Sequence, residues 1–265
     1  MKRKKMTWNR KCMACLLPSL LGLLVFFVLP YIRVVYYSLI RNQFRRDFVG
    51  LDNYKEILQN EYFLLALKNS LLLIAFCVPL LVLLAVGLSV ALLFLFRKLA
   101  GIRVAFILPM LLPTASVVLV FQNVFSEVDN VLPLYLLFLW KNIGICVILL
   151  TAALAVIPEE LYEAARLDGA GEFYMHRTIT LPLILPTVFF AALLSVVNSF
   201  KIFRESYLLY GGKYPPDYGY TLQFFMNNNF QKFDYQALAS SSVLTSLLVV
   251  LFVVVGLRLE RRYRV

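Results

Sequence analysis

Six mostly apolar stretches, each long enough to cross a bilayer as a helix, alternate with polar segments along the chain. An α-helix needs about 20 apolar residues to span the hydrocarbon core, and a helix satisfies its own backbone hydrogen bonds in lipid. A transmembrane β-barrel would show alternating segments of about ten residues, and none occur here. The pattern therefore predicts an all-α integral membrane bundle of six transmembrane helices, with residues 1–265 as a single transmembrane domain. The predicted spans are 16–39, 70–96, 102–125, 132–157, 183–203 and 237–257.

The composition agrees with a membrane protein. Hydrophobic residues make up 61% of the 265 residues and charged residues 15%, whereas about a quarter of a soluble domain is charged. The net charge of +11 comes from basic residues beside the span ends, where they would meet anionic lipid headgroups. The lipid bilayer is therefore the partner that this charge predicts, and nucleic acid is not.

The distribution of lysine and arginine predicts the orientation, because cytoplasmic loops carry the excess of these residues. Basic residues gather before the first span, between the second and third spans, and after the last one. Both termini are therefore expected in the cytoplasm of a multi-pass cell-membrane protein, although the first external loop is also basic. By the same rule, the polar segment 158–182 is cytoplasmic and residues 205–236 are external. The basic residues in these three segments are Lys2, Arg3, Lys4, Lys5, Arg10, Lys11, Arg97, Lys98, Arg103, Arg258, Arg261, Arg262 and Arg264.

Residues that would power transport are missing from the predicted spans. All fifteen acidic residues fall in loops or at span edges, whereas ion-coupled carriers place carboxylates at membrane depth. The chain also lacks the glycine-rich loop that cradles nucleotide phosphates. If it drives uphill transport, the energy must come from another chain.

Metal and redox chemistry are not expected. Cys12 and Cys15 form a C-x-x-C pair, but a metal site or redox motif would need further ligands or a suitable fold around it. No second pair or cluster of histidines accompanies it. The prediction is therefore incidental thiols, no metal and no cofactor.

The segment 158–182 is a folded polar elbow between two spans. Pro158 suits the start of a helix, acidic residues follow it, and Gly169 can close the helix with a positive φ. A second short helical run is expected after Gly171, ending at Leu181-Pro182, where the fifth span begins. From the residues alone, an ordinary solvated helical hairpin is also possible. The residues expected on one face of the first helix are Leu161, Ala164, Ala165 and Asp168.

Two motifs resemble those of a known family. Glu163-Ala164-Ala165, Asp168-Gly169-Ala170 and Ile179-Thr180-Leu181-Pro182 are similar to the EAA loop of binding-protein-dependent ABC importer permeases, and in particular to its carbohydrate branch. Phe48-Val49-Gly50-Leu51-Asp52-Asn53-Tyr54, after the first span, resembles a second segment common in that branch. Two departures stand out, namely His176 at a position often aromatic and the short outer segment 126–130. His176 could be a surface residue or a pH-sensitive contact to the ATPase.

The resemblance implies a transport subunit that is not an enzyme. It would form the path for a carbohydrate delivered by an extracellular solute-binding protein, beside a second permease subunit. That subunit could be a copy of this chain or a different chain, and the resemblance favours a different one. Separate ABC subunits would hydrolyse ATP and dock on the cytoplasmic loop. The residues that the resemblance assigns to this coupling are Glu163, Ala164, Ala165, Asp168, Gly169, Ala170, Leu181 and Pro182.

Polar residues within or beside the spans are candidates for the solute pathway, because a sugar site needs hydrogen-bonding groups and aromatic faces. The same residues could instead bond between helices or lie at the membrane interface. The aromatic external segment 203–236 could receive the binding protein or anchor the chain at the interface. The pathway candidates are Gln122, Asn123, Trp140, Lys141, Asn142, Ser195, Asn198 and Ser199.

Two other functions stay open from the sequence. One is an ABC permease for a non-sugar solute. The other is a polytopic membrane enzyme, although the single histidine, His176, and the absence of acidic residues within the predicted spans offer little for a catalytic cluster.

Overall fold

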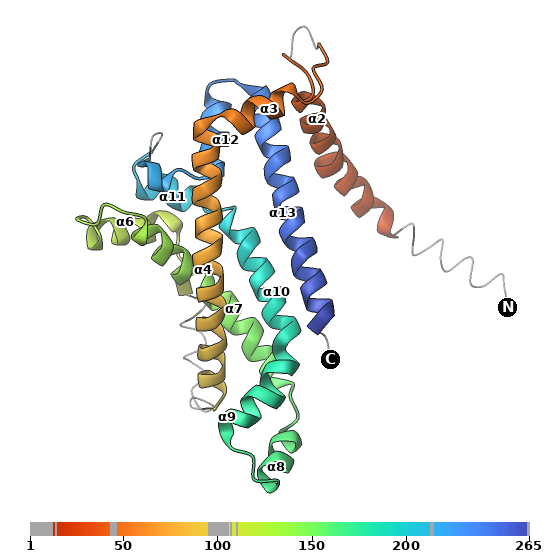
Figure 1. The fold of residues 1–265 in the computed structure, drawn as a ribbon, viewed down its shortest axis with the longest axis vertical. Helices are drawn as coiled ribbons and strands as arrows, with labels where there is room; N and C mark the ends of the chain where they lie inside the picture. Colours follow the sequence, from red (N-terminus) through yellow and green to blue (C-terminus); the bar gives the residue numbers. More distant parts are fainter. Residues whose placement is uncertain are drawn as a thin grey trace, which may run out of the picture. The chain divides into compact units, whose positions relative to one another are not determined.

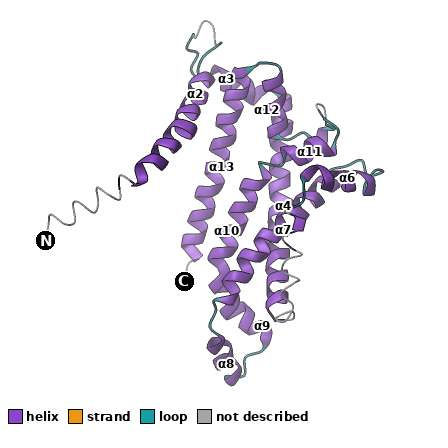
Figure 2. Cartoon of the chain, turned by 180° about the vertical axis from the view of Figure 1, so that it is seen from behind, coloured by secondary structure: helices purple, strands orange, loops and turns teal. Residues whose placement is uncertain are grey.

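The computed structural model describes residues 13, 15–42, 47–94, 106, 108, 109, 111–212 and 215–263. Within these residues the regular structure is helical (Figures 1 and 2), apart from one isolated bridge between Ile40 and Phe48. This confirms the all-α class. The chain divides into two compact units, residues 1–60 with 229–245 and residues 61–228 with 246–265.

The first unit ties the end of the first apolar helix to a short helix after it. A π-helical turn η1 (Leu24–Val28) continues into α2 (Leu29–Ser38), and α3 (Asp52–Gln59) follows the glycine of the second motif. The Asn53 side-chain amide donates to the carbonyls of Ser38 and Ile40, at 2.9 Å each. Tyr54 shares a hydrogen bond of 2.6 Å with the Ser38 hydroxyl. The motif therefore caps carbonyls that a helix end leaves without partners.

Three long helices form the centre of the second unit: α4 (Glu61–Phe94), α7 (Leu132–Ala155) and α10 (Leu181–Ser199). Figure 1 shows them side by side. Leu81, Leu137 and Leu150 are fully buried between them. The Ser89 hydroxyl on α4 lies 3.2 Å from the Val147 carbonyl of α7, which joins the two helices by a polar contact inside an apolar core.

Shorter elements and one further long helix make up the rest of the described fold. The segment after α7 forms α8 (Glu159–Leu167), α9 (Glu172–Met175) and a π-helical turn η2 (His176–Thr180). α6 (Thr114–Val124) packs on α11 (Phe203–Leu209). The remaining elements are η3 (Asp217–Gly219), α12 (Leu222–Gln231) and α13 (Tyr235–Tyr263). The predicted external loop 203–236 is thus largely helical.

Five described helical stretches are long and apolar enough to cross a membrane: Cys15–Ser38, Glu61–Leu92, Leu132–Ala155, Glu172–Ser199 and Tyr235–Arg262. This supports a multi-pass membrane protein. The stretch predicted at 102–125 falls partly on residues outside the description. Its described helix, α6, has 11 residues, short of the roughly 20 needed. Pro113 is extended at its start, with ψ 129°, so the helix does not continue backwards through this residue.

The prediction that Leu181-Pro182 ends the second helical run was wrong. α9, η2 and α10 follow one another without an extended residue, and one candidate span covers Glu172–Ser199. Proline removes one backbone hydrogen bond and crowds the carbonyl four residues before it. Here a π-helical turn directly precedes it, and such turns occur where the regular ladder is disturbed.

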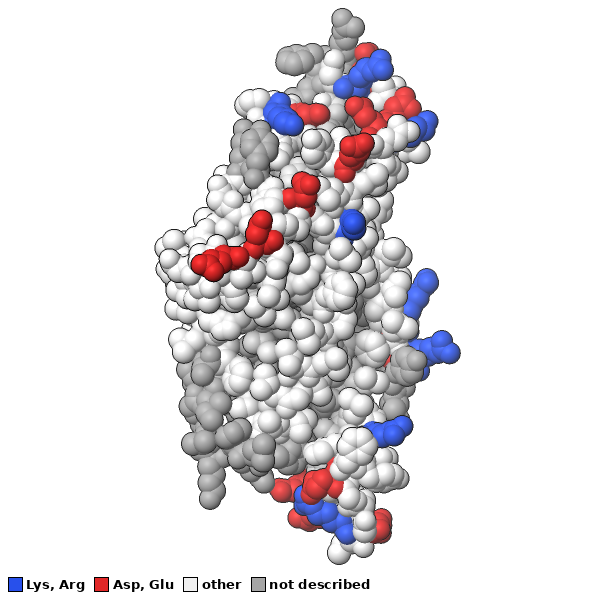
Figure 3. All heavy atoms as spheres, turned by 60° about the vertical axis from the view of Figure 1, so that its left-hand side comes forward, with Lys and Arg blue, Asp and Glu red and all other residues white. Residues whose placement is uncertain are grey.

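Charged side chains are unevenly spread over the surface. In Figure 3 a broad area without lysine, arginine or acidic side chains covers the middle of the face shown, and a mixed cluster of both signs lies at the lower end, where Figure 1 draws α8. An uncharged area of this kind is the surface that a bilayer core requires.

Candidate functional site

Residues next to each other in the sequence determine where helix α8 of the polar elbow begins and ends. Pro158 precedes it in an extended conformation, with ψ 135°, and Glu159 and Glu160 occupy its first turn. Acidic side chains at this end are stabilised by the partial positive charge of the helix N-terminus. The structure therefore confirms the helix that the sequence predicts between Pro158 and Gly169.

Asp168-Gly169-Ala170 closes α8 with a Schellman motif. The Gly169 N–H donates to the Arg166 carbonyl at 3.0 Å, and the Ala170 N–H donates to the Ala165 carbonyl at 2.9 Å. These are the two bonds of that motif, which needs a left-handed residue between them. Gly169 supplies it with φ +80°. Because a Cβ on Gly169 would meet no atom within 4 Å, only the backbone conformation requires glycine here.

A buried hydroxyl holds α8 against the turn η2. Tyr162 is buried, and its hydroxyl lies 2.8 Å from the buried Thr180 Oγ1. His176 Nδ1 lies 3.1 Å from the same oxygen. One threonine hydroxyl can both donate and accept, so it can bond both rings. Sequence reasoning missed Tyr162 and Thr180, and it left His176 open between a surface residue and a contact to the ATPase. In the structure His176 is half-buried and faces Thr180.

The outward face of the elbow carries acidic side chains, a small alanine and apolar side chains. Glu163, Ala164 and Asp168 are exposed, whereas Ala165 is half-buried on the side of Tyr162. Ala165 thus lies at the edge of the face that carries Leu161, Ala164 and Asp168, on the side of the buried Tyr162 three residues before it. Apolar side chains are also exposed beside this face. They are Leu161, Leu167 (91% exposed), Phe173 (81%) and Tyr174.

A second candidate site is a cavity of about 480 Å³ bounded by α7, α10, α11 and the turn that joins the last two. Its lining combines apolar side chains with amides and charges, as sugar-binding cavities do. It brings together three of the predicted pathway residues: Lys141, Asn142 and Asn198. The full lining is Phe138, Lys141, Asn142, Ile145, Leu194, Asn198, Lys201, Ile202 and Glu205.

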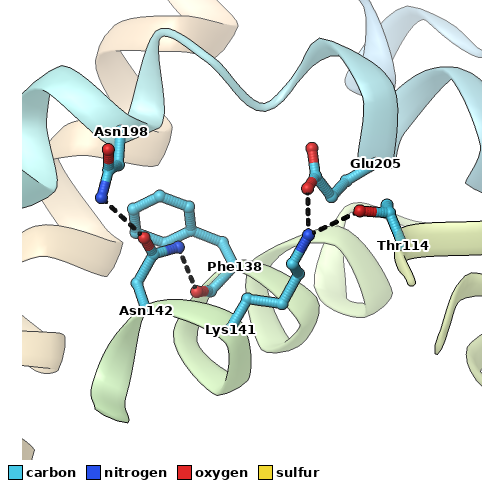
Figure 4. A network of polar contacts seen from close by, with 6 residues as sticks. All are labelled: Thr114, Phe138, Lys141, Asn142, Asn198 and Glu205. Carbon is cyan, nitrogen blue, oxygen red and sulfur yellow. Dashed lines mark hydrogen bonds and ion pairs between the residues drawn. The ribbon is translucent and has the colours of Figure 1, made fainter. Parts of the chain in front are cut away.

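An ion pair forms one wall of the cavity. The Lys141 ammonium on α7 contacts the Glu205 carboxylate on α11 and donates to Thr114 Oγ1 of α6 at 2.9 Å (Figure 4). The two charged side chains are only 16% and 15% exposed. Burying either charge alone would be costly, so each requires the other in this place.

Two hydrogen-bonded asparagine side chains form another part of the cavity lining. Asn198 Nδ2 on α10 donates to Asn142 Oδ1 on α7 at 3.0 Å, and Asn142 Nδ2 donates to the Phe138 carbonyl at 2.8 Å (Figure 4). These hydrogen bonds join α7 to α10, and both amides remain at the cavity surface. Side-chain amides offer donors and acceptors together, which suits hydroxyl groups.

The other predicted pathway residues are not among the lining residues of this cavity. Gln122 Nε2 donates to the Leu208 and Leu209 carbonyls at 2.9 and 3.0 Å, which ties α6 to the end of α11. Asn123 bonds its own helix at the Leu119 carbonyl, and the Trp140 ring lies 6.1 Å from that of Phe121. Ser195 and Ser199 are buried and donate to carbonyls of their own helix.

Sequence reasoning missed Glu205 and Lys201 as lining residues. Glu205 was counted as part of the external loop, yet its carboxylate reaches a lysine inside the candidate span Leu132–Ala155. A signal was available, because Lys141 sits within an apolar stretch and a buried lysine needs a counter-charge. The sequence alone could not say which acidic residue would supply it.

A tyrosine network joins two segments beyond the cavity. The Tyr218 hydroxyl donates to the Asp129 carboxylate, and its ring packs edge-on against that of Tyr210. Burial and the neighbouring carboxylate raise the pKa of Tyr218 to about 12. Burial also raises the pKa of Tyr210. The network fixes the turn after α6 against the segment that contains η3.

No group of three or more potential metal ligands occurs in the part of the chain that the structure describes. Of the C-x-x-C pair, Cys15 is an exposed free thiol. Cys12 lies outside the described residues, so the prediction of incidental thiols is not tested.

The described residues thus form a helical membrane protein with a polar elbow and a polar cavity between its helices, an arrangement that suits a transport permease. Residues 100–265 match the family described as "Binding-protein-dependent transport system inner membrane component", and the chain belongs to this family. The chain is therefore the membrane-spanning subunit of an ATP-driven ABC importer and not an enzyme. This confirms the family that the two sequence motifs indicated.

Two relatives extend the match beyond the family segment. The chain is 30% identical to the arabinooligosaccharides transport system permease protein AraP of Bacillus subtilis, over 91% of this chain and 84% of that protein. It is 30% identical to the trehalose/maltose transport system permease protein MalF of Thermococcus litoralis, over 93% and 92%.

A solved structure shares the fold. It is a chain of a bacterial ABC transporter involved in the import of the acidic polysaccharide alginate, with a TM-score of 0.77, 23% identity and 98% of each chain covered.

Proposed function

We propose that this chain forms the translocation pathway for a carbohydrate that an extracellular solute-binding protein delivers. The observation that carries the proposal is the cavity among α7, α10 and α11, where two amides and an ion pair face the apolar side chain of Phe138. Sugars present hydroxyl groups and apolar ring faces, and such a lining matches both. The sugar permeases AraP and MalF among its relatives support the same solute class.

The polar elbow couples this pathway to ATP hydrolysis. α8 ends in a backbone motif that sets its shape, and small side chains on its exposed face let a partner approach closely. A cleft in the ATPase subunit receives this face and moves it during the ATP cycle. The coupling residues in this proposal are Glu163, Ala164, Ala165, Asp168, Gly169, Ala170, Leu181 and Pro182.

The remaining architecture follows from the same assignment. Six spans form one transmembrane domain, with both termini and the elbow in the cytoplasm and residues 205–236 outside. A second permease subunit, a different chain, completes the pathway. The solute-binding protein docks at the external end, where aromatic side chains of the segment 203–236 gather.

A cross-linking experiment tests the docking and the orientation together. In a chain whose own cysteines are replaced by serine, Ala164→Cys should cross-link to an ATPase subunit of the purified complete importer. The control, Asp217→Cys, places an equally exposed thiol at the other end and should cross-link only to the solute-binding protein or to nothing. An ATPase cross-link from Asp217→Cys, or none from Ala164→Cys, would refute the proposal.

A further inference from the structure

The charges that line the cavity do not balance. Three ionic side chains reach it, namely Lys141, Glu205 and Lys201. Lys141 and Glu205 neutralise each other in the ion pair. Among the residues that the structure describes, no carboxylate pairs with the Lys201 ammonium. Lys201 is exposed, so the lining carries one solvent-accessible positive charge that no described carboxylate pairs.

The backbone of Lys201 is held in place. Its neighbours Phe200 and Ile202 are both buried, and its N–H donates to the Asn198 carbonyl at 3.0 Å. Lys201 thus follows the end of α10, where the helix dipole places a partial negative charge. This attracts the ammonium but amounts to only about half a unit charge, so the group can still bind a full anion.

From this charge balance we propose that the cavity accepts an acidic group on the carbohydrate, a carboxylate, phosphate or sulfate, and that Lys201 recognises it. The inference rests on the proposed function, in which this cavity is the solute pathway. Lys201 contacts the acidic group, while Asn142 and Asn198 contact sugar hydroxyls. Glu205 is a positioning residue, because it neutralises Lys141 and keeps the cavity from carrying a second positive charge.

Substitutions of the two residues should shift the preference in opposite directions. Lys201→Gln removes the uncompensated charge and should abolish the preference for an acid over its neutral ester. Glu205→Gln leaves Lys141 without its counter-charge and should increase that preference. If either residue had a purely structural role, its substitution would weaken the binding of the acid and of the ester by the same factor. Lys201→Arg keeps the charge and should keep the preference.

The test uses two probes that share one sugar backbone and differ in whether their carboxyl groups are charged, trigalacturonate and its fully methyl-esterified form. Their dissociation constants are measured by calorimetry on the purified complete importer in nanodiscs, without the binding protein. We expect the wild type to bind the acid at least about tenfold more tightly, as a charge-assisted hydrogen bond would give. The matched control is Lys68→Gln, which removes an exposed lysine of α4 that is not part of the cavity lining and should keep the ratio. Thermal unfolding confirms that each variant is folded.

Equal affinity for acid and ester in the wild type, binding of neither probe, or an unchanged ratio in a folded Lys201→Gln variant would overturn the inference. ATP-driven uptake of an acidic oligosaccharide and of its neutral ester at equal rates by the wild type would overturn it too, and would leave the importer function standing. Failure of the importer to take up any oligosaccharide with ATP would remove the proposed function itself.

Discussion

The polar elbow and the cavity are built by different kinds of interaction. In the elbow, backbone hydrogen bonds between residues three to five apart close α8, and the small side chain of Ala164 lies on the face toward solvent. In the cavity, side chains far apart in sequence meet, as in the pair formed by Lys141 and Glu205, which are 64 residues apart. The elbow therefore depends on local conformation, whereas the cavity depends on tertiary packing. A change that alters one should leave the other intact.

Breaking the ion pair should have the largest effect on stability. Lys141→Met leaves the Glu205 carboxylate largely buried without its counter-charge, which costs about 3 kcal/mol in comparable cases. We expect a clear fall in the free energy of unfolding, measured by denaturant titration in detergent. The double variant Lys141→Met with Glu205→Gln removes both charges and should recover most of the loss. A single variant as stable as the wild type would show that the cavity does not depend on this contact.

Changing the backbone of the elbow should affect coupling more than folding. Gly169→Val forces a β-branched residue to φ +80°, a strain of about 1–3 kcal/mol, and should weaken the Schellman motif. Solute-stimulated ATPase activity of the complete importer should fall at least severalfold. Gly171→Val is the matched control, because Gly171 has φ −74° and free space around it. Equal losses from both variants would show that φ at Gly169 is not the cause.

The contact between α8 and η2 should contribute less. Tyr162→Phe removes a hydrogen bond to the buried Thr180 hydroxyl, worth about 1 kcal/mol. Amide hydrogen exchange should become faster in the segment 159–180 and stay unchanged near the cavity. Tyr174→Phe, at an exposed position, is the control and should change neither. Faster exchange confined to the cavity helices would contradict the separation of the two regions.

The elbow can be predicted from the sequence better than the cavity, because local conformation builds the elbow and tertiary packing builds the cavity. Asp168-Gly169-Ala170 is readable from the sequence, because a helix end with glycine follows local rules. The contact of Tyr162 with Thr180 and the pair of Lys141 with Glu205 depend on which helices pack together, and no local rule gives this. Pro182 shows the limit within the elbow, since a preceding π-helical turn lets the helix continue where proline usually ends it. The six apolar stretches are visible in the sequence, whereas the break at Pro113 depends on local geometry.

The smallest expected effect concerns pH. The pKa of Tyr218 is about 12 in the folded chain and about 10 in an unfolded one. The folded state thus holds this proton more tightly. The stabilisation is complete below about pH 10 and is lost as the pH rises toward 12. Thermal unfolding between these values should show a small extra loss in the wild type that Tyr218→Phe lacks. An identical pH profile in both would refute the contribution of this contact.

The central claim is that ATP hydrolysis by a separate subunit drives solute import through this chain. Its most direct test is solute accumulation in proteoliposomes that contain the complete importer. The solute-binding protein is supplied on the external side, and ATP on the side of the ATPase subunits. We predict accumulation above the external concentration only when both ATP and the ATPase subunit are present. Ala164→Trp, which adds bulk to the exposed face of α8 and does not touch the cavity lining, should abolish it while the variant still assembles in the membrane. Accumulation without the ATPase subunit, or undiminished accumulation in Ala164→Trp, would contradict the account.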